Sequence, residues 1–306
     1  MPLTKSDVHY DKILTNVSIA YQQDLRDYIW RDLSPIIPVQ KESDKYYVYD
    51  KGPWFRDDAK IIAPGDPTPY TDFTLSKSSY SCEEFGVGAK LPDRIRKNAD
   101  NVLQLRSDYA KLVTQKVHLK MERQLANEIW KTGVWGTDNT TATDWDDYSS
   151  STPLTDVQTA IDTVRLATGK KPNTLAMGSE VWSALMFHPD LTDLIKYTQK
   201  GIVTTDLLAQ VWNLDKVLVG EAVYNSAAEG QSDSMARIWG DNALVAYIAP
   251  TPGLLQPSAM YTFMSQDLKV RRWYDNNTES EIIKASIIAD FVVTGAGLGY
   301  FFYDLT

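Results

Sequence analysis

The chain has 306 residues, 43% apolar and 23% charged, which is ordinary for a globular protein with a sizeable core and about two domains. Its formal net charge of −9 disfavours a protein whose main task is to grip nucleic-acid phosphates, but leaves room for a container whose wall faces DNA. The single cysteine, Cys82, excludes an intramolecular disulfide framework and fits a reducing compartment.

Neither a signal peptide nor a membrane span is expected. The first residues lack an apolar core behind basic residues. The most apolar run, residues 285–303, contains Asp290 and three glycines, so it predicts strands rather than a membrane helix. We therefore expect a soluble protein that is cytoplasmic when made.

An amphipathic helix is predicted over residues 11–30, where apolar side chains recur at three- and four-residue steps. Pro35 and Pro38 are expected to stop it. The aromatic run at residues 46–49 predicts a short strand.

Residues 34–93 predict an extended, strand-rich arm. A Gly- and Pro-rich tip at residues 52–69 separates the strand at 46–49 from a partly alternating stretch at 71–89. An isolated two-stranded ribbon is marginal in water, so the arm needs a partner surface. Its apolar side chains include Trp54, Phe55, Ile61, Ile62, Tyr70, Phe73 and Phe85.

Residues 98–131 predict one long helix, because apolar residues follow helical spacing and neither Gly nor Pro intervenes before Gly133. Such a helix would be roughly 45–50 Å long, which is typical of a spine. The heptad is not strict, so a coiled coil is disfavoured.

The polar stretch at residues 137–152 predicts a surface loop and a domain boundary. A helix should follow, with Thr152 as N-cap, Pro153 in the first turn, Asp156 facing the helix dipole and Gly169 at the end.

Beyond Gly169 the pattern alternates, which predicts an α/β domain over residues 150–255 followed by a β-rich end. Helices are expected at 179–187 and 204–212. Strands are expected at 174–177 and 217–224, as a pair within 238–248, and at 261–264, 269–274, 282–293 and 300–303.

The sequence favours neither a catalytic nor a metal site. His118 and Glu122 share a helix face, but without a third ligand they indicate a surface pair. His188 is expected to cap helix carbonyls, and Cys82 to be a small buried residue. No cofactor motif is present, and the acidic loop Asp144, Asp146 and Asp147 predicts a solvated turn.

Glycines 295, 297 and 299 predict a close-packed strand crossing rather than a phosphate-binding loop. The pair Glu83–Glu84 predicts an exposed turn of the arm. The basic residues along residues 94–123 and at Arg271 and Arg272 could face DNA or acidic neighbours, and the negative net charge makes ion pairing at least as good an explanation.

The order of parts resembles the major capsid proteins of tailed bacteriophages, with the HK97-like (Hong Kong phage) fold. Three stretches carry the resemblance: KPNTLAMGSEVWSALMFHPDLTDLIKY at 171–197, LLAQVWNLDKVLVGEAVYNSA at 207–227 and IWGDNALVAYIAP at 238–250. The likeness is one of pattern and covers nearly the whole chain.

The resemblance implies an α+β fold in five parts. These are an N-terminal arm at 1–33, an extended two-stranded loop at 34–93 that lies across an adjacent subunit, a peripheral domain with the spine helix at 94–149, an axial domain at 150–265, and strands at 266–306 that return to the peripheral domain.

It also implies a structural role without catalysis. The chain would self-assemble into the pentamers and hexamers of an icosahedral shell around double-stranded DNA, in the virion, after assembly in the cytoplasm of a bacterial host. Implied partners are a separate scaffolding protein, a portal and possible decoration proteins, with packaged DNA in non-specific contact and no membrane. The lysine, asparagine and glutamate that cross-link some relatives cannot be assigned here.

Trp54, Phe55 and Arg56 at the arm tip are the predicted interface anchors, because Trp and Arg dominate interface hot spots. The alternative is that these side chains cover the arm's own base. Three other functions stay open: an encapsulin-like compartment for cargo, a minor or decorating virion protein, and a hydrolase built on residues 150–255, for which the sequence shows no nucleophile, base and acid set.

Overall fold

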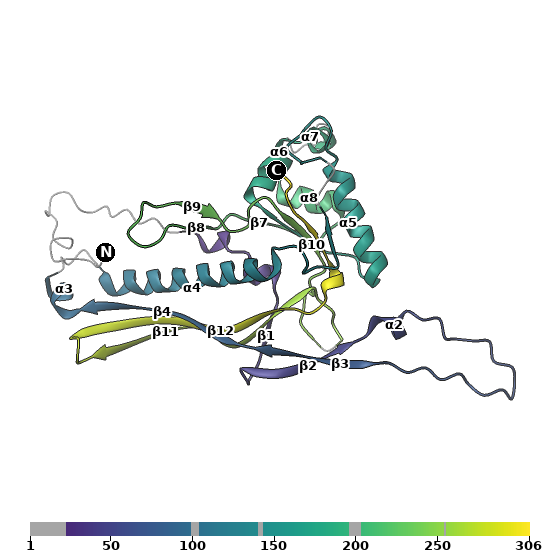
Figure 1. Cartoon of the computed structure of the whole chain (residues 1–306), viewed down its shortest axis with the longest axis horizontal. Helices are drawn as coiled ribbons and strands as arrows, with labels where there is room; N and C mark the ends of the chain where they lie inside the picture. The colour runs from purple at the N-terminus through teal and green to yellow at the C-terminus, as the bar shows by residue number, and fades with distance from the viewer. Residues whose placement is uncertain (1–22, 99–103, 140–142, 196–202, 254) are drawn as a thin grey trace.

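The computed structural model describes residues 23–98, 104–139, 143–195, 203–253 and 255–306. Its elements gather around two sheets, with a long arm on one side (Figure 1). One sheet has four strands in the order β1-β11-β12-β4, and the other has five in the order β5-β13-β10-β6-β7.

The four-stranded sheet and the helix α4 form one body, which we call the peripheral domain. Helix α4 lies over one face of the sheet, and its Val117 and Met121 belong to the same buried core as Ile283 and Ala285 of β12. The strands are β1 (Ile36–Pro38), β4 (Glu83–Pro92), β11 (Met260–Asp275) and β12 (Ser280–Val293).

The predicted spine helix is confirmed, with shorter ends. Helix α4 spans Leu105–Ile129, and a separate helix, α3 (Asp93–Asn98), precedes it. Residues 99–103 lie outside the described residues. Trp130 is the C-cap: its N–H still donates to the Ala126 carbonyl, but its ψ of 51° lies outside the helical region, so the helix ends before residue 131.

The predicted N-terminal helix is wrong where the structure describes it. Residues 11–22 lie outside the described residues. Beyond them, Asp24 caps a short 3-10 turn, η2 (Leu25–Asp27), and Tyr28 is extended before the one-turn helix α1 (Trp30–Leu33). The capping box of Asp24 and Asp27 therefore breaks the periodicity into two pieces.

The arm is a ribbon of β2 (Ser43–Tyr49) and β3 (Leu75–Ser81), paired antiparallel from Ser43↔Ser81 to Tyr49↔Leu75. The predicted two-stranded arm is thus confirmed, but its second strand ends earlier than expected. Residues 83–92 form β4, the edge of the peripheral sheet, where they pair with β12. Glu83 and Glu84 lie in this strand rather than in a turn.

The five-stranded sheet is covered by helices, and this body is called the axial domain. The helices are α5 (Pro153–Thr168), α6 (Ser179–Phe187), α7 (Pro189–Ile195) and α8 (Thr205–Trp212). The strands are β5 (Thr137–Asn139), β6 (Thr174–Gly178), β7 (Lys216–Gly220), β10 (Ala243–Ala246) and β13 (Gly299–Phe302).

Most helices of the axial domain begin and end at the residues that the sequence predicted. Thr204 caps α8 by accepting from the Leu207 N–H, and Gly169 ends α5 in the left-handed region at φ 69°. The exception is Thr152, whose side chain makes no capping bond among the described contacts. Asp156 instead accepts a hydrogen bond from the Trp145 indole at 3.0 Å, which anchors the preceding loop.

Several strand predictions change in detail. The strand expected at 217–224 is two strands, β7 and then β8 (Val223–Asn225), which pairs with β9 (Met235–Arg237). The pair expected within 238–248 is wrong, because that range holds a single strand, β10, and the strand before it, β9, belongs to another sheet. The strands expected at 261–264 and 269–274 form one strand, β11, with register shifts between Met264 and Lys269.

The last strand differs from the expected return to the peripheral domain. Strands β11 and β12 do return, but β13 pairs with β10 and β5 in the axial sheet. All four of its residues are buried, which suits a place inside a helix-covered sheet. Gly299 is required there, since a Cβ would fall 2.2 Å from the Trp135 ring, and the predicted close packing is thereby confirmed.

Candidate intersubunit interface

The base of the arm is packed, and its tip is not. The Tyr80 ring stacks on Phe263 with a centroid separation of 4.4 Å, and buried Cys82 donates to the Phe263 carbonyl at 3.4 Å. Burial raises the pKa of the Cys82 thiol, as expected of a small core residue. These contacts fix the start of the ribbon on the peripheral sheet.

Beyond the last ribbon pair, the arm projects away from the rest of the chain (Figure 1). Residues 55–74 form neither helix nor strand, and their large apolar side chains face solvent. Ile61 and Tyr70 are 104% and 94% exposed. The exposed set is Tyr47, Trp54, Phe55, Ile61, Ile62, Tyr70, Phe73 and Leu75.

The three predicted anchors lie together where the tip begins. Trp54 ends the short helix α2 (Lys51–Trp54), and Phe55 and Arg56 follow it directly. All three are exposed, Trp54 by 60% and Phe55 by 64%. Part of the Phe55 ring lies against Gly169 of the same chain, at the end of α5 rather than on the arm's base, and most of its surface stays exposed.

This much exposed apolar surface calls for a partner. Burying apolar area stabilises an association by about 25 cal/mol per Å², and large patches on a protein surface mark interaction sites. Because the tip extends away from both domains, the two sheets of its own chain leave these side chains uncovered. The arm is therefore our candidate intersubunit interface.

Three arginines of the peripheral domain share one ion-pair cluster. Buried Glu281 on β12 meets Arg106 at 2.7 Å, Arg272 at 2.9 Å and Arg96 at 3.3 Å. Arg96 also contacts Asp93 at 3.0 Å. Ion pairing, the explanation that the net charge favoured, accounts for these three arginines.

The predicted surface pair, His118 and Glu122, is buried instead. Glu122 is fully buried, and its carboxylate accepts from the N–H groups of Ile29 and Trp30 and from the Trp239 indole. His118 is buried between Tyr28 and Trp30, and desolvation lowers its pKa. The prediction failed because the exposed face of α4 was assigned by residue type rather than by position.

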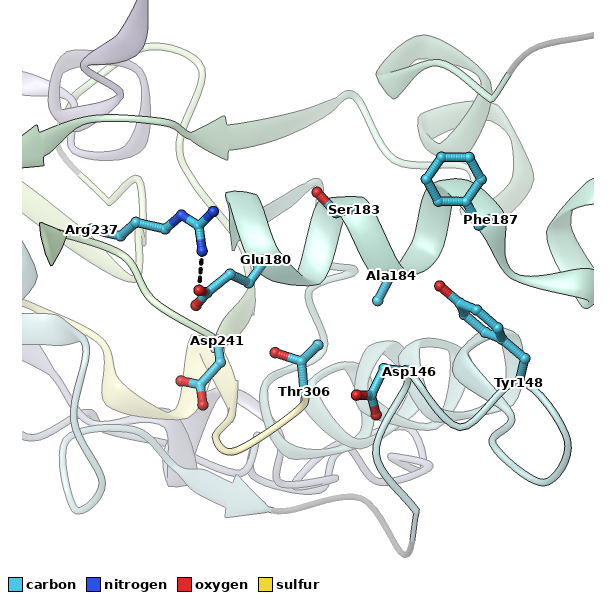
Figure 2. A pocket seen from close by; sticks show the side chains of 9 residues that line it. All are labelled: Asp146, Tyr148, Glu180, Ser183, Ala184, Phe187, Arg237, Asp241 and Thr306. Carbon is cyan, nitrogen blue, oxygen red and sulfur yellow. Dashed lines mark hydrogen bonds and ion pairs between the residues drawn. The ribbon is translucent and has the colours of Figure 1, made fainter.

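The axial domain carries an open pocket of about 510 Å³ (Figure 2). Asp241 and the ion pair of Glu180 with Arg237 lie on one side, and Asp146, Tyr148 and Phe187 on the other. The nine lining residues include a serine, Ser183, but no histidine. Ser183 donates to the Ser179 carbonyl one helical turn away, so the pocket holds no activated nucleophile.

A serine, a histidine and an aspartate do meet next to Tyr148, one of the residues that line this pocket, and the sequence analysis missed them. Ser151 Oγ lies 2.9 Å from His188 Nε2, and His188 Nδ1 lies 3.9 Å from the Asp190 carboxylate. Both Ser151 and His188 are buried. Only a three-dimensional contact joins Ser151 to His188, 37 residues away, so no motif marks them.

Their hydrogen bonds oppose catalysis. His188 Nδ1 accepts from the backbone N–H of Asp190, so the ring proton belongs on Nε2, which donates to Ser151. Ser151 in turn donates to the Asp147 carbonyl. A hydrolytic triad needs the reverse tautomer and an accessible hydroxyl, so this network fastens the loop before α5 to α7. His188 thus caps a backbone N–H, not the carbonyls that we predicted.

The acidic loop is held by its own serines. Asp147 accepts from the hydroxyls of Ser149 and Ser150, each at 2.6 Å, and these bonds lower the pKa of Asp147 to about 2. Across the described ranges, no cluster of three His, Cys, Asp or Glu residues is arranged to hold a metal. Within the same ranges, no helix is long and apolar enough to cross a membrane.

Comparisons with known proteins point to one group. Residues 135–279 match the family described as Phage major capsid protein E. The chain is 25% identical to the major capsid protein of Burkholderia phage BcepMu over 300 residues, covering 95% of this chain and 94% of that protein.

Solved structures share the fold over nearly the whole chain. A phage-related protein from Bordetella bronchiseptica matches with a TM-score of 0.71 and 24% identity, covering 93% of this chain and 94% of the other. The capsid protein of cyanophage P-SCSP1u matches with a TM-score of 0.66 and 13% identity, covering 97% and 93%. A virus-like particle from Pyrococcus furiosus matches with a TM-score of 0.56 and 10% identity, covering 92% of each chain.

Proposed function

Because this chain belongs to the major capsid proteins of tailed phages and has their HK97-like fold, we propose that its copies form pentamers and hexamers that close into an icosahedral shell around double-stranded DNA. The protein is a structural component of the virion rather than an enzyme. What remains to be tested is the form of its capsomers, their contents and the surfaces that join them.

The exposed arm tip is the observation that supports this mechanism. A side chain such as Tyr70 is held out on a long ribbon with nearly its whole surface in water. Each contact made by such an arm can be modest, since every subunit in a closed shell touches several neighbours and many weak contacts act together. Trp54, Phe55 and Arg56 are our proposed anchors of this contact.

We further propose that the shell is completed with a scaffolding protein, a portal and decoration proteins. The packaged DNA would touch the wall without sequence-specific contacts. A net charge of −9 supports weak contact of this kind, because tight phosphate binding requires an excess of cationic side chains.

The anchors are tested by the double substitution Trp54→Ala/Phe55→Ala. Both side chains are largely exposed, so the subunit should fold normally, while shells seen by negative-stain electron microscopy should be lost. Phe187→Ala is the matched control, because Phe187 is an aromatic residue that is 66% exposed on α6, away from the arm, and should assemble as the parent does. Normal particles from the double variant would refute the role of these anchors.

A cargo compartment of the encapsulin type is the second candidate, since the fold also matches the virus-like particle from Pyrococcus furiosus. The sequence match to a phage major capsid protein over 95% of the chain favours the viral shell. Heating purified particles and measuring the released nucleic acid separates the two: genome-length DNA supports the viral shell, and protein cargo without DNA supports the compartment.

A further inference from the structure

Where the arm tip begins, at α2, the arm touches the axial domain of its own chain at the C-terminal end of α5. The Lys51 ammonium donates a hydrogen bond to the carbonyl of Ala167 at 3.0 Å. The Phe55 ring lies over Gly169, where a Cβ would fall 2.7 Å from ring atoms Cε1 and Cζ. Figure 1 shows α2 beneath this end of α5.

The chemistry of the two sides is complementary. The last carbonyls of a helix have no partner within the helix and carry partial negative charge, so a lysine ammonium is stabilised there. Gly169 has φ 69°, a conformation that side chains other than glycine seldom adopt, and its missing side chain leaves room for the ring. One polar and one apolar contact therefore meet at a single helix end.

Without this contact, the arm would be directed by its ribbon alone. The ladder of β2 and β3 ends at Tyr49↔Leu75, just before α2. Two-stranded ribbons are only marginally stable and twist easily. A small change of angle at α2 would displace the far tip strongly, because residues 55–74 extend from this point.

We propose that the contact of Lys51 and Phe55 with the C-terminal end of α5 fixes the direction in which the arm leaves the subunit. Through this contact, which we call the stop, the arm moves together with the axial domain. The contact lies within one subunit, so this inference goes beyond the proposed shell and needs no neighbouring copy. Phe55 keeps 64% of its surface exposed, which leaves its other face free for a partner.

Spin-label distances test the stop directly. Labels at Ala63→Cys on the arm tip and Asp162→Cys on α5, in a Cys82→Ala background, report the arm angle by pulsed electron paramagnetic resonance on dissociated subunits. We expect one narrow distance peak for the labelled parent. Lys51→Ala and Phe55→Ala should each raise the fraction of subunits outside this peak about fivefold, as expected for loss of a helix-end contact.

Matched controls separate the stop from a general effect on the arm. Lys60→Ala and Tyr70→Ala remove an exposed lysine and an exposed aromatic residue further along the tip, and should keep the narrow peak. Lys51→Arg keeps a cationic donor and should restore it. A broad peak in the parent, or equal widths in parent and Lys51→Ala, would overturn the stop.

The outcome is independent of shell formation. Trp54→Ala leaves Lys51 and Phe55 in place and should keep the narrow peak, so a loss of particles in this variant would locate the fault in the contact between subunits. Broadened arms in a variant that still assembles would support the stop and show that neighbours can order the arm by themselves.

Discussion

The indole N–H of Trp239 donates a hydrogen bond to Glu122 Oε1 at 2.7 Å, which joins the spine helix of the peripheral domain to the segment before β10 in the axial domain. The same carboxylate accepts from the N–H groups of Ile29 at 2.9 Å and Trp30 at 3.0 Å. One fully buried carboxylate thus holds three parts of the chain together: α1, α4 and the entry to the axial sheet.

The first prediction concerns loss of this acceptor. At pH 5, Glu122→Ala should lower the free energy of unfolding by about 2–4 kcal/mol, because it leaves three N–H donors buried without an acceptor. Glu122→Gln should cost less, about 1–3 kcal/mol, because its amide oxygen can still accept from Ile29 and Trp239, whereas its amide nitrogen cannot accept from Trp30. Chemical denaturation of dissociated subunits measures both values.

Glu128 provides the control on the same helix, since it is exposed and accepts only from Gln124 among the described side chains. Glu128→Ala should change stability by less than about 0.5 kcal/mol. If Glu122→Ala is as mild as Glu128→Ala, then Glu122 is not the residue that joins the three parts.

The second prediction concerns pH. Burial raises the pKa of Glu122 to about 7 from its ordinary 4.5, because desolvation of the carboxylate outweighs the hydrogen bonds that favour its charged form. The folded state therefore binds this proton more tightly than the unfolded state. The contribution of this proton to the free energy of unfolding is fully present below pH 4.5 and is lost as the pH rises through about 7.

Glu122→Gln mimics the protonated acid and does not titrate. Relative to the parent, the variant should therefore gain stability as the pH rises from 5 to 8, by up to about 3 kcal/mol. Nearby His118 is present in both proteins, so its own titration largely cancels in the difference. A difference between the two proteins that stays constant from pH 5 to pH 8 would contradict the raised pKa.

The third prediction concerns the charge cluster at Glu281, which ties together α3, α4, β11 and β12. Glu281→Ala should destabilise the subunit by about 2–4 kcal/mol, because three guanidinium groups lose one shared, buried partner. Arg106→Ala should cost less than about 1 kcal/mol, since that side chain is half exposed and two arginines remain.

Urea denaturation in low and high salt measures this cluster. The exposed pair Lys284–Glu84 is the control, and Lys284→Ala should be nearly neutral. If Glu281→Ala proves as mild as Lys284→Ala, then the cluster contributes little to the peripheral domain.

The parts of this fold that sequence could predict are those marked by local chemistry. Pro153 and Gly169 bounded α5, Thr204 began α8, and an uninterrupted run of helix formers marked α4. The strand partners were harder to predict, because alternation shows which residues share a face but not which strand lies beside them. Hence β4 was assigned to the arm, and β13 to the wrong sheet.

The candidate interface, too, could be predicted only where local sequence marks it. The Gly- and Pro-rich tip predicted an exposed arm, but the contact of Lys51 with Ala167 joins residues 116 positions apart and leaves no mark in the sequence. The burial of Glu122 could have been predicted. Positions 118, 122, 125 and 129 lie on one face of α4, and the last two are leucine and isoleucine. This pattern indicates that the face is buried, so Glu122 is buried by its position on the helix although it is polar.

The fourth prediction concerns the glycine that makes room for Trp239. A Cβ at Gly220, the last residue of β7, would lie 2.1 Å from Cδ1 of the Trp239 ring. Gly220→Ala must therefore push the indole away from Glu122, and should cost about 1–3 kcal/mol through overpacking. Indole fluorescence and denaturation together report the displacement and its cost.

Gly88→Ala is the matched control, because Gly88 also lies in a strand, β4, and a Cβ there would have ordinary contacts at 3.8–3.9 Å. It should be neutral or slightly stabilising, since alanine restricts the unfolded chain more than glycine does. Combining Gly220→Ala with Glu122→Ala should cost less than the sum of the two, because each change disrupts the same hydrogen bond. Strict additivity would show that Trp239 keeps its place without Glu122, and that the two domains are joined elsewhere.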